Sequence, residues 1–265
     1  MHGATAHRYA QGARVLPARR HSAVRAAAAG RIKRLSSAGP TPLTDAPGVA
    51  TRRLALFDLD GTLTRHDTLL PYVTGFLHRR RHLARLARVL PALVAFAIRR
   101  IDRGGLKSAL IRSTLGGASR AELDAWTVQF VRTLLERGMY SDALDALGAH
   151  RRAGDLLVLL SASTDLYVPT IGQALGFAEV ICTGLSWDGT RLVGRLTSKN
   201  RRGAEKARCL GSLRETHPGM PITAYGNSAS DLEHLRLAER GVLVNGSRRA
   251  RRAAGAAGIE CVHWR

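Results

Sequence analysis

Short apolar runs that end in polar residues recur along the chain from Leu54 onward. They are LALFDLD, DLLVLLSAST, PITAYGNSASD and GVLVN, at residues 54–60, 155–164, 221–231 and 241–245. Such runs, bounded by turn residues, are typical of strands that are buried on both faces, and a segment with helical spacing follows each of them. This alternation of strands and helices predicts an α/β fold around a mostly parallel sheet.

A long helical block separates the first of these strands from the second. Residues 69–147 have apolar residues at helical spacing and no strand pattern. A crossover between parallel strands needs only about a dozen residues or more, so this block is too long for a simple connection. We expect residues 54–69 and 144–265 to form the α/β core, and residues 70–143 to form a helical cap inserted over the ends of the strands.

One segment of this cap, residues 83–98, is strongly apolar on one side and basic on the other. Its apolar run of ten residues, 89–98, is too short for a membrane span, which needs about 20 residues. Pro91 should kink or restart the helix. We expect the apolar stripe to pack inward against the protein, and the alternative is a helix that lies on an anionic bilayer. The stripe consists of Leu83, Leu86, Leu90 and Val94, with Arg81, Arg85 and Arg88 opposite.

The first 53 residues differ in composition from the rest of the chain. They carry ten basic residues and one acid, without periodic apolar runs. Three interpretations compete: a transit-like leader, a basic tail that contacts anionic surfaces, or residues upstream of a true start near Val49. We favour the last, because a clean strand pattern begins abruptly at Leu54. The absence of an apolar signal core and three widely spaced cysteines predict a cytoplasmic protein.

The net charge of +21 would normally suggest a nucleic-acid partner or an anionic membrane surface. However, the basic residues are 37 Arg and only 4 Lys, alongside many Ala and Gly, a bias that GC-rich codons also produce. Five Tyr and five Phe are few for stacking single-stranded bases. We therefore do not expect nucleic acid to be the partner.

Candidate chemistry begins at the end of the first strand, in the sequence FDLDGT. Strand alternation places Asp58 and Asp60 on the same side, where neither carboxylate is expected to be buried without a partner. Sites in open α/β sheets lie beyond the carboxyl ends of the strands. Two carboxylates at this position need a cation or must share a proton.

Other polar residues follow the later strands, and each alone is a weak signal. Ser161 ends the second apolar run, Lys206 precedes a helical stretch, and Asn227 and Asp231 follow the third strand. Serine at such a position often only caps the next helix. Oxygen-bearing side chains at neighbouring strand ends could hold a hard cation such as Mg²⁺.

Taken in this order, the motifs resemble those of the haloacid dehalogenase (HAD) superfamily over about Leu54–Val244. GAEK ahead of a helix, AYGNSASDLEHL and the helical insert after the first motif are similar to the phosphoserine phosphatase-like subclass (subfamily IB). The resemblance implies a Rossmann-like core with an inserted helical cap, and a phosphatase. It assigns Asp58 as the nucleophile that forms an aspartyl-phosphate, Asp60 as general acid and base, and Ser161 and Lys206 as ligands of the phosphoryl oxygens.

The resemblance also implies a Mg²⁺ ion bound by Asp58, the backbone carbonyl of Asp60, Asn227 and Asp231. Family members often carry Asp where this chain has Asn227. The amide still offers an oxygen but removes one negative charge, so either Asp231 compensates or metal affinity falls. The complete set of the other motif residues favours an active phosphatase.

The substrate is less well specified, and we expect a small phosphomonoester such as phosphoserine. Asp67 stands nine residues after Asp58, where phosphoserine phosphatases hold the substrate amine, and its alternative role is a helix cap. The apolar, Arg-rich segment 81–100 is similar to bacterial phosphatidylglycerophosphatases, so a lipid phosphate at a membrane surface is an alternative. A phosphomutase and a catalytically silent binding protein are further alternatives. The sequence does not define the oligomeric state.

Overall fold

A six-stranded parallel sheet forms the centre of the molecule in the computed structural model, which describes residues 52–265. The strand order is β3-β2-β1-β6-β7-β8, and every neighbouring pair is parallel. The α/β, Rossmann-like fold class is thus confirmed, whereas the predictions for residues 1–51 lie outside the described residues. The strands are β1 (Leu54–Phe57), β2 (Leu156–Thr164), β3 (Glu179–Thr183), β6 (Ile222–Gly226), β7 (Arg240–Val244) and β8 (Glu260–Val262).

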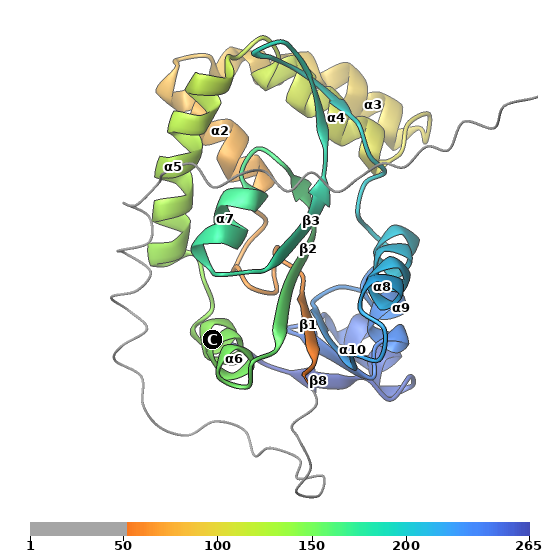
Figure 1. Cartoon of the computed structure of the whole chain (residues 1–265). Coiled ribbons are helices and arrows are strands. Elements are labelled where there is room, and N and C mark those ends of the chain that lie inside the picture. Colours follow the sequence, from red (N-terminus) through yellow and green to blue (C-terminus); the bar gives the residue numbers. More distant parts are fainter. Residues whose placement is uncertain (1–51) are drawn as a thin grey trace, which may run out of the picture.

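Both faces of the sheet are covered, because every residue of β1 is apolar and fully buried. Leu54 and Leu56 pack into one apolar cluster, and Ala55 and Phe57 pack into the other. Figure 1 shows the two helical layers on opposite sides of the strands. One layer contains α6 (Ser141–Arg152) and α7 (Val168–Ala174), and the other contains α8 (Ala204–Thr216), α9 (Leu232–Leu237) and α10 (Arg248–Gly255).

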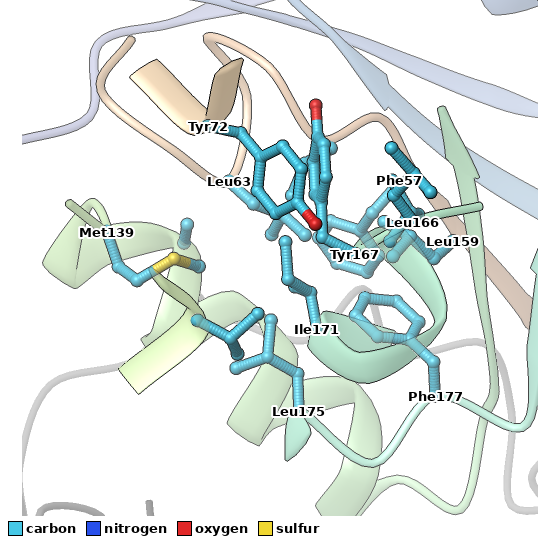
Figure 2. Close-up of a cluster of buried hydrophobic side chains, with 14 of the residues drawn as sticks. Phe57, Leu63, Tyr72, Met139, Leu159, Leu166, Tyr167, Ile171, Leu175 and Phe177 are labelled. Atoms are coloured by element: carbon cyan, nitrogen blue, oxygen red, sulfur yellow. The ribbon is translucent and has the colours of Figure 1, made fainter. Parts of the chain in front are cut away.

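The helical block between β1 and β2 forms a lobe beyond the carboxyl ends of the strands (Figure 1). It contains no strand, as predicted, and Pro91 lies at the start of a new helix, as predicted. Aromatic rings join the lobe to the core, since the rings of Tyr72 and Tyr167 are 4.6 Å apart (Figure 2). The elements of the lobe are α2 (Leu69–Arg79), a 3₁₀ helix η1 (Leu83–Val89), α3 (Leu90–Ala97), α4 (Arg103–Leu115) and α5 (Arg120–Arg137).

An antiparallel hairpin of β4 (Leu185–Asp188) and β5 (Arg191–Leu196) extends this lobe. It lies within residues 144–265, which the sequence assigned to the core, but it packs against α4. The backbone N–H of Gly117 donates to the carbonyl of Leu192 over 2.9 Å. The lobe is therefore built from two separate stretches of the chain.

The prediction that the apolar stripe of residues 83–98 packs inward is wrong for three of its four residues, and only Leu86 packs against the core. Leu83, Leu90 and Val94 are 44%, 59% and 61% exposed. The first half of the segment is a 3₁₀ helix with three residues per turn, so the 3.6-residue spacing assumed from sequence does not describe which side it buries. Val89 is the buried residue. Within residues 52–265, no helix is both long and apolar enough to cross a membrane.

Candidate active site

Asp58 follows directly after β1 and lies at the carboxyl end of the sheet. Its backbone N–H donates to the carbonyl of Tyr225 on the neighbouring strand over 3.1 Å, which fixes where the side chain starts. The carboxylate is buried and is contacted by two donors. Lys206 Nζ lies 2.6 Å from one oxygen, and Thr62 Oγ1 donates to the other over 3.1 Å.

Lys206, in the first turn of α8, is buried between two carboxylates. Its Nζ lies 2.6 Å from Asp58 Oδ1 and 2.7 Å from Asp231 Oδ1, and the lysine is only 3% exposed. The second oxygen of Asp231 accepts from the Ser228 N–H and hydroxyl over 2.9 and 2.6 Å. Three residues that are distant in the sequence thus form one charged cluster.

The two carboxylates of this cluster differ in how easily they ionise. Burial raises the pKa of Asp58 to about 7, with the charge of Asp231 adding to the effect and Lys206 opposing it. Burial also acts to raise the pKa of Asp231, but Lys206, His234 and the Ser228 hydrogen bond hold it well below its usual range. Asp231 is therefore the permanent anion, and Asp58 is the group that needs a further cation to stay ionised at neutral pH.

Asp60 points to a different set of partners. Thr68 donates to its Oδ1 from both the backbone N–H (2.7 Å) and the hydroxyl (2.6 Å), and the Ser163 hydroxyl donates to its Oδ2 over 2.6 Å. Burial raises its pKa, with the charge of Asp67 adding and these hydrogen bonds opposing. The carboxyl group is held in one orientation and retains a proton more readily than an exposed aspartate.

A close backbone approach lies beside these carboxylates. Gly61 has a φ of +76°, and a Cβ at this position would collide with the side-chain amide of Asn227. The glycine therefore permits both the left-handed turn after Asp60 and the approach of Asn227 to it. The loop after β6 is in this way brought against the loop after β1.

Two other predicted site residues are placed less centrally. Ser161 is fully buried, its Oγ accepts from the Ser163 N–H over 3.0 Å, and it is not among the residues that line the cavity. Asp67 lines the cavity. Its Oδ1 accepts from the backbone N–H groups of Leu69 (3.0 Å) and Leu70 (3.4 Å), so it binds the first N–H groups of α2, although Thr68 is the N-cap residue of that helix.

A cavity of about 640 Å³ contains this constellation and is closed on one side by the lobe. Lys107 of α4 reaches across to the core, where its Nζ donates to the Ala162 carbonyl (2.6 Å) and to Asn200 Oδ1 (2.7 Å). Burial lowers the pKa of Lys107 to about 8, opposed by Asp60 and Asp67. The lobe adds the apolar residues Phe96, Leu106 and Leu110, and further cationic groups on the wall are Arg65, Arg103 and Arg202.

The oxygen donors at the floor of this cavity suit a hard divalent cation. Within residues 52–265, no cluster of three or more His, Cys, Asp and Glu is arranged to hold a metal. Asp58 and Asp231 carry carboxylates, and Asn227, which lines the same cavity, carries an amide oxygen. Mg²⁺ prefers such oxygen ligands and keeps several waters, so this partial set fits it.

Three residues with evident roles at the site were not found by sequence reasoning. Thr68 and Ser163 orient Asp60, and Lys107 lies at the cavity wall. Alternation along β2 places Ser161 and Ser163 on the same side, so that signal was present in SAST. The sequence offers no comparable signal for Lys107, which is one basic residue among many in the lobe.

Comparison with known proteins identifies relatives across most of the chain. A family model described as haloacid dehalogenase-like hydrolase matches residues 55–236. Protein CicA of Caulobacter vibrioides is 33% identical over 189 residues, covering 70% of this chain and 83% of CicA. A probable phosphatase of Mycobacterium tuberculosis is 26% identical over 234 residues, covering 82% and 77%. A phospho-aspartyl intermediate analogue of phosphoserine phosphatase shares the fold, with a TM-score of 0.57 at 14% identity, covering 80% of this chain and 93% of that one.

Proposed function

The chain belongs to the haloacid dehalogenase-like hydrolase family, and we propose that it is a magnesium-dependent phosphatase that acts through an aspartyl-phosphate on Asp58. The predicted class, a HAD-type phosphatase, agrees with this membership and with the phosphatases among the similar proteins. One observation carries the mechanism: Asp58 is held by Lys206 and Thr62, while Asp60 is held apart from them by Thr68 and Ser163.

In the first step, a carboxylate oxygen of Asp58 attacks the phosphorus atom of a phosphomonoester. The bond from phosphorus to the ester oxygen breaks, and the leaving oxygen takes the proton from Asp60. The raised pKa of Asp60 supports this role, because burial makes its carboxyl group hold a proton more readily than that of an exposed aspartate.

In the second step, water attacks the aspartyl-phosphate, and Asp60, now deprotonated, accepts the proton from that water. Inorganic phosphate leaves and Asp58 is regenerated as a carboxylate. Thr68 and Ser163 bind both oxygens of Asp60, so they fix its orientation through both steps. Tyr167 supports Thr68, since its hydroxyl lies 3.1 Å from Thr68 Oγ1 and burial holds the pKa of Tyr167 well above its usual range.

Charge neutralisation is the main requirement for attack by one anion on another. Lys206 supplies one positive charge at Asp58, and its position lets it bind a transferring phosphoryl oxygen. A Mg²⁺ ion held by Asp58, the Asp60 carbonyl, Asn227 and Asp231 would supply the remaining charge between nucleophile and phosphate. We also propose that Ser161 contributes to phosphoryl binding, after a rearrangement that frees its hydroxyl.

The cavity favours a small, strongly anionic substrate. Lys107, Arg103 and Arg202 line the same cavity as the carboxylates, so a second anionic group beside the phosphate would find a cation. Asp67 stands where it can meet a substrate amine, which makes phosphoserine the first candidate.

We propose that residues 70–143 act as a cap that closes over this cavity and excludes water from the first step. Cys182, Cys209 and Cys261 are free thiols, which supports a cytoplasmic protein.

The test is hydrolysis of an aryl phosphate by the full chain, with Mg²⁺ or with EDTA. We expect Mg²⁺-dependent release of phosphate that falls at least about a thousandfold in Asp58→Asn, since the nucleophile is lost. The matched control, Asp188→Asn, changes an exposed aspartate of β4 and should keep full activity. Full activity in Asp58→Asn, or in EDTA, would contradict the proposal.

The remaining alternatives make different predictions in the same assay. A catalytically silent binding protein would release no phosphate from an aryl phosphate, phosphoserine or a short-chain lipid phosphate. A phosphomutase would transfer the phosphoryl group to a second position of its substrate in preference to water. Comparison of phosphoserine with a water-soluble lipid phosphate then separates the two substrate classes.

A further inference from the structure

An apolar surface patch lies on the lobe, outside the site described above. Eight large apolar side chains are exposed within residues 52–265, and five of them are on η1 and α3 or directly after α3. These five, named here the η1–α3 patch, are Leu83, Leu90, Leu93, Val94 and Ile98, with exposed fractions between 44% and 61%. Single exposed apolar residues are ordinary, but a group of five within sixteen residues indicates an interaction surface.

Part of the same segment also packs against the protein. Val89 is buried and Leu86 packs against the core cluster. Phe96 lines the cavity, and no residue of α3 is fully buried. The segment is therefore apolar on both sides, one facing the protein and the other facing outward. Outward-facing apolar residues on an anchored segment need a partner to cover them.

Basic residues surround the patch, and this determines the kind of partner. Residues 79–100 contain seven arginines and no acidic residue. Arg81, Arg88, Arg99 and Arg100 are exposed, and none of the ion pairs found within residues 52–265 involves them. Apolar residues set among arginines match the boundary between lipid tails and anionic headgroups.

We propose that the η1–α3 patch docks on the surface of an anionic lipid bilayer. Other occupants fit the charge less well. A second copy of the chain would bring the same arginines together, and residues 1–53 carry ten basic residues against one acid. An anionic membrane satisfies both the apolar side chains and the surrounding arginines.

The docked orientation also relates the membrane to the cavity. Phe96 of α3 and Arg103 of α4 line that cavity, and α3 packs against α4. Docking through the outer side of α3 would bring the lobe side of the cavity close to the headgroups. This inference concerns the docking surface alone and holds whether or not the chain hydrolyses a phosphate.

The experiment is flotation of the full chain with vesicles in low and high salt. We expect binding to vesicles with equal parts of phosphatidylglycerol and phosphatidylcholine in low salt, and release in high salt, where charges are screened. Leu90→Gln/Val94→Gln should weaken this binding at least tenfold. Its control, Leu237→Gln, changes an exposed leucine of α9 and should bind like the wild type.

The contribution of charge is tested separately with Arg88→Gln/Arg100→Gln. A basic residue near an anionic surface adds a factor of about five to binding, so this pair should weaken it about 25-fold. Arg248→Gln/Arg249→Gln on α10 is the control for net charge. Failure of the wild type to bind, equal binding to pure phosphatidylcholine, or wild-type binding by both lobe variants would overturn the proposal. Unchanged melting temperatures would show that the variants fold.

Discussion

Lys206→Met tests the electrostatics of the site without any substrate. The substitution keeps much of the side-chain volume and removes an ammonium that lies 2.6 Å from Asp58 and 2.7 Å from Asp231. Two buried carboxylates then face each other without their shared cation. Removing one partner of a buried ion pair destabilises a protein by about 3–5 kcal/mol, a large share of a typical folding free energy of about 5–15 kcal/mol.

The pH dependence of this loss follows from the folded-state pKa of Asp58. Burial already raises that pKa to about 7, and Lys206 is the largest effect that lowers it. In the variant the pKa rises further, so the native state takes up a proton that the unfolded state does not hold near neutral pH. The stability of the variant should therefore fall as pH rises through 7, and its deficit should be smaller at pH 5 than at pH 8.

Urea denaturation in EDTA, followed by circular dichroism at both pH values, measures these free energies. Lys199→Met is the matched control, because Lys199 is exposed and takes part in none of the ion pairs found within residues 52–265. We expect it to change stability by less than about 0.5 kcal/mol. A loss below about 1 kcal/mol in Lys206→Met at pH 8, or a loss of equal size at pH 5, would refute the account of the cluster.

Three further substitutions probe other parts of the structure. Gly61→Ala should lower kcat at least about tenfold, because Gly61 has a φ of +76° and the new Cβ would collide with the Asn227 side chain. The control is Gly189→Ala, which also has a positive φ, of +53°, but has open space around the new Cβ and should keep normal kinetics. Thr68→Val removes a hydroxyl donor to Asp60 and should lower kcat by about ten- to a hundredfold in steady-state assays. Its control is Thr74→Val in α2, the helix that follows Thr68, because the Thr74 hydroxyl bonds only backbone carbonyls, and this variant should have normal kcat. Asp165→Asn should stabilise the protein at pH 8 but not at pH 4. Burial raises the pKa of Asp165 from 3.8 to about 6, so above pH 6 the native state carries a buried negative charge that destabilises it. Chemical denaturation should show a gain of at most about 3 kcal/mol, and a destabilised Asp165→Asn at pH 8 would show that the charge is needed.

Sequence patterns predicted the strands best where both faces are buried. The residues of β1 are all apolar and fully buried, so their run is continuous in the sequence. By contrast β3 was missed, because Glu179 to Cys182 are only half-buried and form a short edge strand without a continuous apolar run. The side that residues 83–98 turn to the protein was predicted wrongly for most of the stripe, since the first half of the segment is a 3₁₀ helix and does not follow the 3.6-residue period.

The candidate site shows the same limit in its chemistry. Asp58, Lys206 and Asp231 could be proposed from sequence because they end strands or begin helices at one edge of the sheet. Their contacts come from three separate segments, so their distances were not predictable. The orientation of Asp60 by Thr68 depends on where α2 begins, and that depends on packing of the lobe.

The central claim is that Asp58 carries the phosphoryl group during turnover, and mass spectrometry of the trapped enzyme tests it most directly. In Asp60→Asn the base for the second step is lost, so the intermediate should accumulate with an aryl phosphate, whose leaving group needs little protonation. After an acid quench, the peptide that contains Asp58 should carry the mass of one phosphoryl group, and Asp58→Asn/Asp60→Asn should carry none. Steady turnover by the wild type with the phosphoryl group on another residue would contradict the account.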